Sequence, residues 1–234
     1  MQNVSADYIN ILAGSHWFEC SITFDGRNSI VTESDLFSVV ISHKLFDTTP
    51  QIGTAVAAEI EIKMIDPSFT IPTMAKIQPY VRACNETQQS EWIRQGVFYV
   101  DTRERTKDDT GLSILTIHGY DGMLKAEQMF DGGNTITGDS TDTSMLDYIA
   151  SKIGTSVDSR TYTIMNKAYT VPLPTGYTYR EILGYIASMY AGCFIMTEEG
   201  KLRLVALYDI PPETNYLIDN VGNAITFGGD RILV

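Results

Sequence analysis

The segment GVFYVDTRERTKDDTGLSILTIHGY, residues 96–120, predicts an antiparallel β-hairpin. Both of its ends are rich in Val, Ile, Phe, Tyr and Thr, the residues that are enriched in strands. Between them, Asp108, Asp109 and Gly111 supply the residue types that reverse a chain between two antiparallel strands. The alternation LSILTIHGY gives the second strand two distinct faces, with Leu115 and Ile117 on one of them.

Similar segments precede this hairpin along the chain. They are HWFECSITF (16–24), LFSVVISHKLF (36–46), AVAAEIEIKMI (55–65) and AKIQPYVRA (75–83). In the third of them Ile60, Ile62 and Met64 alternate with charged residues, which is the period of a strand with one buried face. Residues 1–130 are therefore expected to form an antiparallel sheet that closes into a barrel or sandwich, with few if any helices.

The periodicity changes after the glycine-rich stretch DGGNTITGDSTD, residues 131–142. In the following TSMLDYIASKIG the apolar residues recur at spacings of three and four, which predicts a helix whose buried stripe is Leu146, Ile149, Ala150 and Ile153. Ser144, with Asp147 three residues later, is the expected start of the helix, and Gly154 is its expected end.

A second helix with a hairpin is predicted over residues 175–209. Thr178 and Glu181 have the spacing of a capping box, and Gly192 is the expected end of the helix. The expected buried stripe is Ile182, Leu183, Ile186, Ala187 and Tyr190. Arg180 is expected on the open face. The turn Glu198, Glu199 and Gly200 then joins CFIMT to KLRLVALY as a hairpin, so this part is a small α+β unit.

The sequence thus predicts a mainly β chain with an α+β insert. The first β domain is expected at 1–130, the small connecting domain at 131–209, and the start of a second, incomplete β domain at 210–234. The sequence ends in RILV, a strand-like run whose edge needs a partner. Two explanations are open: the chain is a piece of a longer protein, or neighbouring subunits complete the sheet.

Composition limits the possible partners of the chain. Its 17 Lys and Arg against 29 Asp and Glu give a net charge of −12, which disfavours binding through DNA phosphates. Cys20, Cys84 and Cys193 are expected to be reduced and packed, in keeping with synthesis in a reducing cytoplasm. No apolar run reaches the roughly 20 residues of a membrane helix, and the amino terminus lacks a secretion signal.

No residue pattern identifies a catalytic, cofactor or metal site. His16, His43 and His118 are isolated from one another and from cysteine pairs, so they lack a zinc spacing. Neither a GxSxG turn nor a phosphate loop is present in the sequence. We therefore expect no cofactor and no enzymatic activity.

Three weaker hypotheses about functional sites are open, and the residues of each also have a purely structural interpretation. Asp131, Asp139 and Asp142 could hold calcium on their loop, although acidic loops are more often only solvated. Asp101 with Glu104, or Glu198 with Glu199, could be a glycosidase pair. The 13 tyrosines could line a carbohydrate groove, but packing in the core explains them better.

Two segments resemble a known family. Phe98–Arg103 and Leu112–Ala126 match the pattern F-Y-[IV]-D-x-R, hairpin, L-x-I-x-[AG]-Y-D-x-M-L-K-A of hub proteins at the tail tip of bacteriophages, especially of prophages in Gram-positive hosts. DYIASKIG and the stretch VPLPTGYTYREILGYIASMYAGCFIMTEEGKLRLVAL are similar to a later part of the same family. The matches lie in the family's order and cover roughly half of the chain.

The resemblance implies a structural role. Such hubs are similar to baseplate hubs of contractile phages and to type VI secretion spike proteins, with two barrel-like tube domains per chain and three chains in a ring. The ring would continue the tail tube and contact the distal tail protein, the tape measure protein and the tip or spike. The protein would then lie in the virion tail, and DNA would touch it only while passing through the lumen. The alternatives are a cell-wall hydrolase and a carbohydrate-binding adhesion domain.

Overall fold

The computed structural model describes residues 4–25, 30–46, 49, 51–67, 69–132, 135–207, 226–227 and 230–231. The predicted start of a second β domain, residues 210–234, therefore lies outside the described residues, except for two short strands. These are β14 (Thr226–Phe227) and β15 (Asp230–Arg231), which pair antiparallel with each other. The predicted terminal strand RILV lies mostly outside the described residues too.

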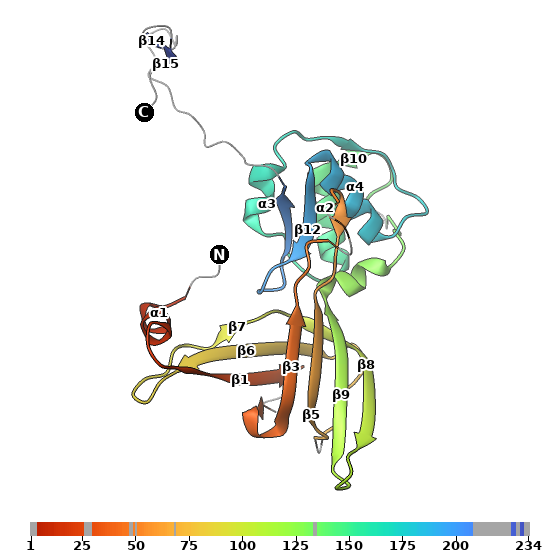
Figure 1. Cartoon of the computed structure of the whole chain (residues 1–234). Coiled ribbons are helices and arrows are strands. Elements are labelled where there is room, and N and C mark those ends of the chain that lie inside the picture. The colour runs from red at the N-terminus through yellow and green to blue at the C-terminus, as the bar shows by residue number, and fades with distance from the viewer. Residues whose placement is uncertain are drawn as a thin grey trace.

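Short helices and strands make up the described chain (Figure 1). The helices are α1 (Ala6–Leu12), α2 (Asp142–Lys152), α3 (Ser159–Ile164) and α4 (Tyr179–Met189), with 3-10 segments η1 (Glu33–Asp35) and η2 (Gly122–Glu127). The remaining strands are β1 (Trp17–Phe24), β2 (Ile30–Thr32), β3 (Leu36–Ser42), β4 (Thr54–Ala55), β5 (Glu59–Ile65), β6 (Lys76–Cys84), β7 (Ile93–Arg94), β8 (Phe98–Lys107), β9 (Ser113–Asp121), β10 (Ser140–Thr141), β11 (Thr170–Val171), β12 (Gly192–Met196) and β13 (Leu202–Ala206).

The predicted mainly β fold is confirmed, and its largest sheet is antiparallel throughout. The strand order is β2-β1-β6-β8-β9-β5-β3, with β7 also paired to β6. In Figure 1, β1 and β6 run across the block formed by β3, β5, β9 and β8. β6 and β8 share only the pairs Lys76–Tyr99 and Ile77–Phe98, so the sheet bends sharply there. The expected closed barrel is not observed among the described residues, because the path of pairings ends at β2 and β3.

The predicted hairpin of residues 96–120 is β8 and β9. Gly111 has φ +86°, a conformation that glycine adopts without steric cost, and its N–H donates to the carbonyl of Asp108. Alternation in β5 is also confirmed, because Ile60, Ile62 and Met64 are buried while the charged residues between them are exposed. The first core contains these residues with Ile22, Phe24, Ala58, Ile71, Ala75, Ile77, Phe98, Val100, Leu115 and Ile117.

One helix of this part was not expected. Helix α1 begins after Ser5, whose hydroxyl accepts the Tyr8 N–H at 3.1 Å, and it buries only Ile11. A helix with a single buried residue has no apolar stripe, and therefore it gives no periodic signal in the sequence.

The two later helices confirm the predicted buried stripes, with small corrections at their ends. Thr178 and Glu181 form the predicted capping box. Helix α4, however, ends at Met189 rather than at Gly192, because Ala191 takes φ +45° and Gly192 already begins β12. Helix α2 begins after Thr141, not at Ser144, and the Thr141 hydroxyl accepts the Ser144 N–H.

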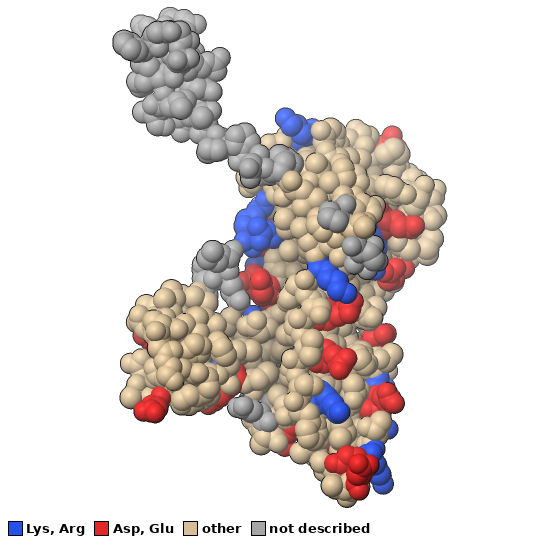
Figure 2. All heavy atoms as spheres, in the orientation of Figure 1, with Lys and Arg blue, Asp and Glu red and all other residues tan. Residues whose placement is uncertain are grey.

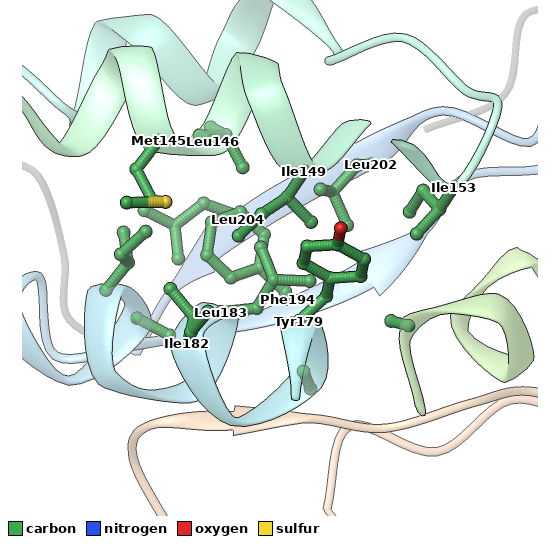
Figure 3. Close-up of a cluster of buried hydrophobic side chains, with 14 of the residues drawn as sticks. Met145, Leu146, Ile149, Ile153, Tyr179, Ile182, Leu183, Phe194, Leu202 and Leu204 are labelled. Carbon is green, nitrogen blue, oxygen red and sulfur yellow. The ribbon is translucent and has the colours of Figure 1, made fainter. Parts of the chain in front are cut away.

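These helices cover a second sheet of order β13-β12-β4 and form a second core (Figure 3). Figure 3 shows side chains of α2 and α4 pointing at Phe194, Leu202 and Leu204 of the sheet. The buried members are Ala55, Met123, Ala126, Ile136, Met145, Leu146, Tyr148, Ile149, Ile153, Met165, Val171, Tyr179, Ile182, Leu183, Ile186, Ala187, Tyr190, Phe194, Met196, Leu202 and Leu204. The predicted hairpin of β12 and β13 turns at Gly200, with φ +77°.

The second core takes residues from the first 130 as well. Strand β4 pairs parallel with β12, which places Ala55 in the second core, and Met123 and Ala126 of η2 join it. A two-residue strand followed by VAA gives no periodic signal, so this pairing could not be read from the sequence. The domain limits 1–130 and 131–209 stay a prediction.

Candidate functional site

The three histidines lie apart in the structure. His16 is exposed and bonds the carbonyl of Gly14 at 2.8 Å, and His43 is exposed near the ring of Phe98. His118 on β9 lies 3.6 Å from the carboxylate of Glu61 on β5. Within the described residues, no three His, Cys, Asp or Glu side chains are grouped as metal ligands.

The three aspartates of the glycine-rich loop do not converge. Asp131 accepts hydrogen bonds from Lys152 at 2.6 Å, from Tyr179 at 2.9 Å and from Tyr148. The Lys152 ammonium and the two hydroxyls hold the pKa of Asp131 low, at about 2. Asp142 is instead fully buried and accepts the hydroxyl of Tyr190. Asp131 and Asp142 thus each accept hydrogen bonds from neighbouring side chains of the chain and do not form a common site.

The candidate acid pairs lie on open surface. Asp101 and Glu104 are exposed on β8, and Glu198 and Glu199 are exposed in the β12–β13 turn, where Glu199 faces Lys201 at 3.7 Å. None of these four carboxylates lies in the lining of the cavity that Glu127 and Arg180 border.

Two of the cysteines and several of the tyrosines are buried. No disulfide joins the three cysteines of the described chain: Cys84 and Cys193 are buried, and Cys20 is half-buried. Burial raises the pKa of the Cys84 thiol. Three tyrosines, Tyr148, Tyr179 and Tyr190, belong to the second core, whereas others such as Tyr185 are exposed.

Two charged residues that the sequence did not assign to a site, Arg180 and Asp121, lie where the chain crosses between the two cores, which we call the junction. Arg180 of α4, expected on the open face, is half-buried; its Nε donates to the carbonyl of Ala55 at 2.6 Å, and its Nη1 pairs with Glu127. The predicted position of Arg180 on the open face of the helix is therefore wrong. The register of α4 is correct, but the segment of residues 51–58 that contains β4, which we call the β4 strap, lies over the face where Arg180 projects.

Asp121 is the second residue, and it ends β9. It is 3% exposed. Its Oδ2 accepts the Ala58 N–H at 2.8 Å and its Oδ1 accepts the Met123 N–H at 2.9 Å. Burial raises the pKa of Asp121 to about 6, although those two N–H groups and the charge of Arg180 act in the opposite direction. An Asp before a helical turn is a capping signal that could have identified this residue.

A cavity of about 240 Å³ lies beside this junction. It is lined by Lys44, Val56, Ala57, Glu59, Tyr120, Leu124, Glu127 and Arg180. Its lining comes from β5, β9, η2 and α4, which are elements of both cores.

The strands β8, β9, β5 and β3 form the other candidate site, a four-stranded antiparallel block whose outer strands among those described are β3 and, beyond Val100, β8. Among the described strands, β3 pairs only with β5. Beyond Val100, the one described strand that pairs with β8 is β9, and the Arg103 side chain donates to the Ile71 carbonyl and the Thr73 hydroxyl. One face of the block covers the first core, and the other exposes Glu59, Glu61, Lys63 and His118. Acidic and basic side chains are interspersed on the side of the block seen in Figure 2.

Comparison with solved structures shows which fold this is. The 43 kDa tail protein of prophage MuSo2 from Shewanella oneidensis matches 86% of this chain with a TM-score of 0.54 and 14% identity. The tail protein from Neisseria meningitidis MC58 matches 88% with a TM-score of 0.51 and 12% identity. The chain spans 59% and 58% of the lengths of these two proteins. A PdpA–VgrG complex is more distant, with a TM-score of 0.45.

The chain thus has the fold of prophage tail proteins, as the resemblance in its sequence predicted. No protein-family profile matches the sequence, and no curated protein matches it either. Among the described residues, no helix has the length and apolar character required to cross a membrane.

Proposed function

We propose that this chain is a structural hub protein of a phage or prophage tail tip or baseplate, and that three copies form a ring which continues the tail tube. The proposal is supported by the fold shared with two prophage tail proteins. The observation that carries the ring is the four-stranded block with an open edge on each side.

The two edges suit head-to-tail contact between copies. Edge strands present unpaired N–H and C=O groups that pair with another chain. The block has an even number of antiparallel strands, so β8 of one copy runs opposite to β3 of a copy rotated about an axis along the strands. A rotated neighbour can therefore continue the antiparallel pattern, and a heterologous contact of this kind closes into a ring when the rotation allows it.

In this ring the exposed face of the block lines the channel. Its charges include Glu59 and Glu61, and the whole chain carries a net charge of −12, so DNA would pass without adhering. The domain at 131–209 lies further out and connects the first tube domain to a second one that begins within 210–234. The ring's partners are the tail tube with its distal tail protein and tape measure protein, and the tip or spike protein.

We further propose that the chain has no enzymatic activity, no cofactor and no metal. The candidate acids Asp101, Glu104, Glu198 and Glu199 are exposed on a strand and a turn, and none of them lines the cavity beside the junction. Purified protein incubated with peptidoglycan should release no more reducing ends or peptides than a heat-inactivated sample. A higher release would favour the hydrolase alternative.

Location within the virion tests the structural proposal directly. Synthesis takes place in the host cytoplasm, and the finished protein is expected in the virion tail. Antibody against this chain, viewed by electron microscopy on purified tails, should label the end of the tail distal to the head. Labelling along the whole shaft, or on the head, would contradict the hub position.

A further inference from the structure

Both tryptophans of the chain are exposed, and both belong to the same end of the large sheet. Trp17 is 47% exposed at the start of β1, and Trp92, directly before β7, is 41% exposed. Strand β6 lies between β1 and β7, and in Figure 1 these three strands reach away from the block of β3, β5, β9 and β8. Tryptophan is highly buried on average and is enriched at binding surfaces, so the exposure of both indoles points to a binding role.

The register of the strands places the two indoles on one face of the sheet. Trp17 and Glu19 point to the same side of β1, because side chains alternate along a strand. Glu19 is the cross-strand neighbour of Arg82 on β6, and its Oε2 accepts hydrogen bonds from Nε and Nη2 of Arg82 at 2.8 and 2.6 Å. The Arg82 guanidinium in turn lies 4.5 Å from the centre of the Trp92 ring. The four side chains Trp17, Glu19, Arg82 and Trp92 therefore form one row, which we call the tryptophan strip.

The middle of the tryptophan strip is polar, and its geometry is fixed by the ion pair. The side chains of Arg82 and Glu19 are 23% and 25% exposed, so a ligand lying on the strip can reach both. The hydrogen bond from Arg82 lowers the pKa of Glu19, and hydrogen bonds from Cys84 and Trp17 act in the same direction. The carboxylate accepts hydrogen bonds, and the guanidinium donates them.

We propose that the tryptophan strip is a binding site for a neutral polysaccharide. The C–H face of a pyranose ring is apolar and packs flat on an indole, while the hydroxyls around the ring need hydrogen-bond partners. The strip offers this combination, two indoles with an ion pair between them. Trp17 and Trp92 are two strand spacings apart across the sheet, about 10 Å, so a chain of sugars is needed to span both. The site goes beyond the structural role and does not depend on the ring.

The ion pair favours a sugar over a protein as the occupant. The core of a protein–protein interface is depleted of Glu and Asp, and a protein that covered both indoles would also bury Glu19 and Arg82 at a cost in desolvation. The hydroxyls of a sugar instead donate to the carboxylate and accept from the guanidinium. Glu19 and the net charge of −12 disfavour an acidic polymer, so the sugar chain is expected to be neutral.

The intrinsic fluorescence of the chain tests the proposal, since Trp17 and Trp92 are its only tryptophans. The purified protein is titrated with cellohexaose, laminarihexaose, maltohexaose, chitohexaose and mannohexaose. At least one of them should change the emission with saturation, at a Kd of about 1 mM or lower. Polygalacturonate, which is acidic, should bind more weakly than that oligosaccharide. The proposal is wrong if none of the neutral oligosaccharides changes the emission at about tenfold higher concentration, or if the acidic polymer binds best.

Variants on the two faces of β1 show whether binding uses the strip. Trp17→Ala and Trp92→Ala should each weaken binding about tenfold or more in calorimetric titrations, because each removes a stacking platform. Phe18→Ala is the matched control, since Phe18 is also 47% exposed but points to the opposite face, and it should bind like the wild type. Equal losses in Trp17→Ala and Phe18→Ala would contradict the proposal. If a tryptophan variant does not fold, the titration of the wild-type chain decides.

The assembled tail separates a sugar from a protein as the occupant. In purified tails reconstructed by electron cryomicroscopy, the tryptophan strip should face solvent. A neighbouring protein or a second copy seated on both indoles would overturn this proposal and leave the ring unaffected. Failure of the ring, in turn, would not change the binding of oligosaccharides by the isolated protein.

Discussion

Asp131 organises the second core from its surface. This exposed carboxylate accepts bonds from Tyr148 and Tyr179, and both rings pack beneath it with Phe130 at centroid distances of 5.8 to 6.4 Å. Lys152 at the end of α2 completes the group. The ionised form is therefore the one that the folded chain favours.

The pKa of Asp131 predicts how Asp131→Asn depends on pH. Because the folded pKa is lowered from 3.8 to about 2, the contribution of Asp131 to stability is complete above about pH 4 and disappears as the pH falls toward 2. Thermal melts should show a lower melting temperature for Asp131→Asn at pH 7. The difference from wild type should shrink between pH 4 and pH 2.

Asp139→Asn is the matched control for that experiment. Asp139 is exposed on the same loop, and it accepts one long hydrogen bond, 3.4 Å, from the Leu173 N–H within the described part of the chain. The control should melt with the wild type at both pH values. A loss in Asp131→Asn that is constant from pH 7 to pH 2 would contradict the role given to its charge.

Helix α4 links the second core to the β4 strap, and its two faces differ sharply in solvent exposure. Ile186 is fully buried, whereas the neighbouring Tyr185 is 53% exposed. Ile186→Asp should place an unpaired charge in the core and lower the free energy of unfolding by about 3 kcal/mol or more. Tyr185→Ser should cost less than about 1 kcal/mol. Denaturant titrations in which both variants are equally stable would contradict the register of the helix.

The same helix approaches the β4 strap through a glycine. A Cβ atom on Gly184 would lie 2.7 Å from the carbonyl oxygen of Gly53, closer than such contacts occur. Helix propensity alone predicts that Gly184→Ala stabilises by about 1 kcal/mol. We expect a net loss of about 1 to 3 kcal/mol instead, because the strap must shift.

Ser151→Ala, on the exposed side of α2, isolates the effect of propensity. It should leave stability unchanged or raise it slightly, as measured in the same denaturant titration. A gain of stability in Gly184→Ala would show that the strap yields easily and that the close approach does not matter.

The elements with a periodic pattern of apolar residues were predicted from the sequence. The features that depend on contacts between residues far apart along the chain were not. Alternation in residues 59–64 and the stripe from Ile182 to Tyr190 depend on local spacing, and both are confirmed. The placement of Arg180 and the pairing of β4 with β12 depend on a strap that lies more than a hundred residues away along the chain. The fold could therefore be predicted from the sequence, whereas the junction between the two cores could not.

For the whole molecule, the central claim is the ring of three chains on the tail axis. It depends on the outer edges of β3 and β8. In our proposal neighbouring tail proteins contribute contacts in the particle, so isolated protein is not required to assemble. The assembled tail is consequently the right object to measure.

Electron cryomicroscopy of purified tails, reconstructed without imposed symmetry, tests this claim most directly. Our account predicts three copies of the chain around the axis, with β8 of one copy beside β3 of the next and Glu61 facing the channel. A ring of six copies, or a position away from the tube axis, would contradict it.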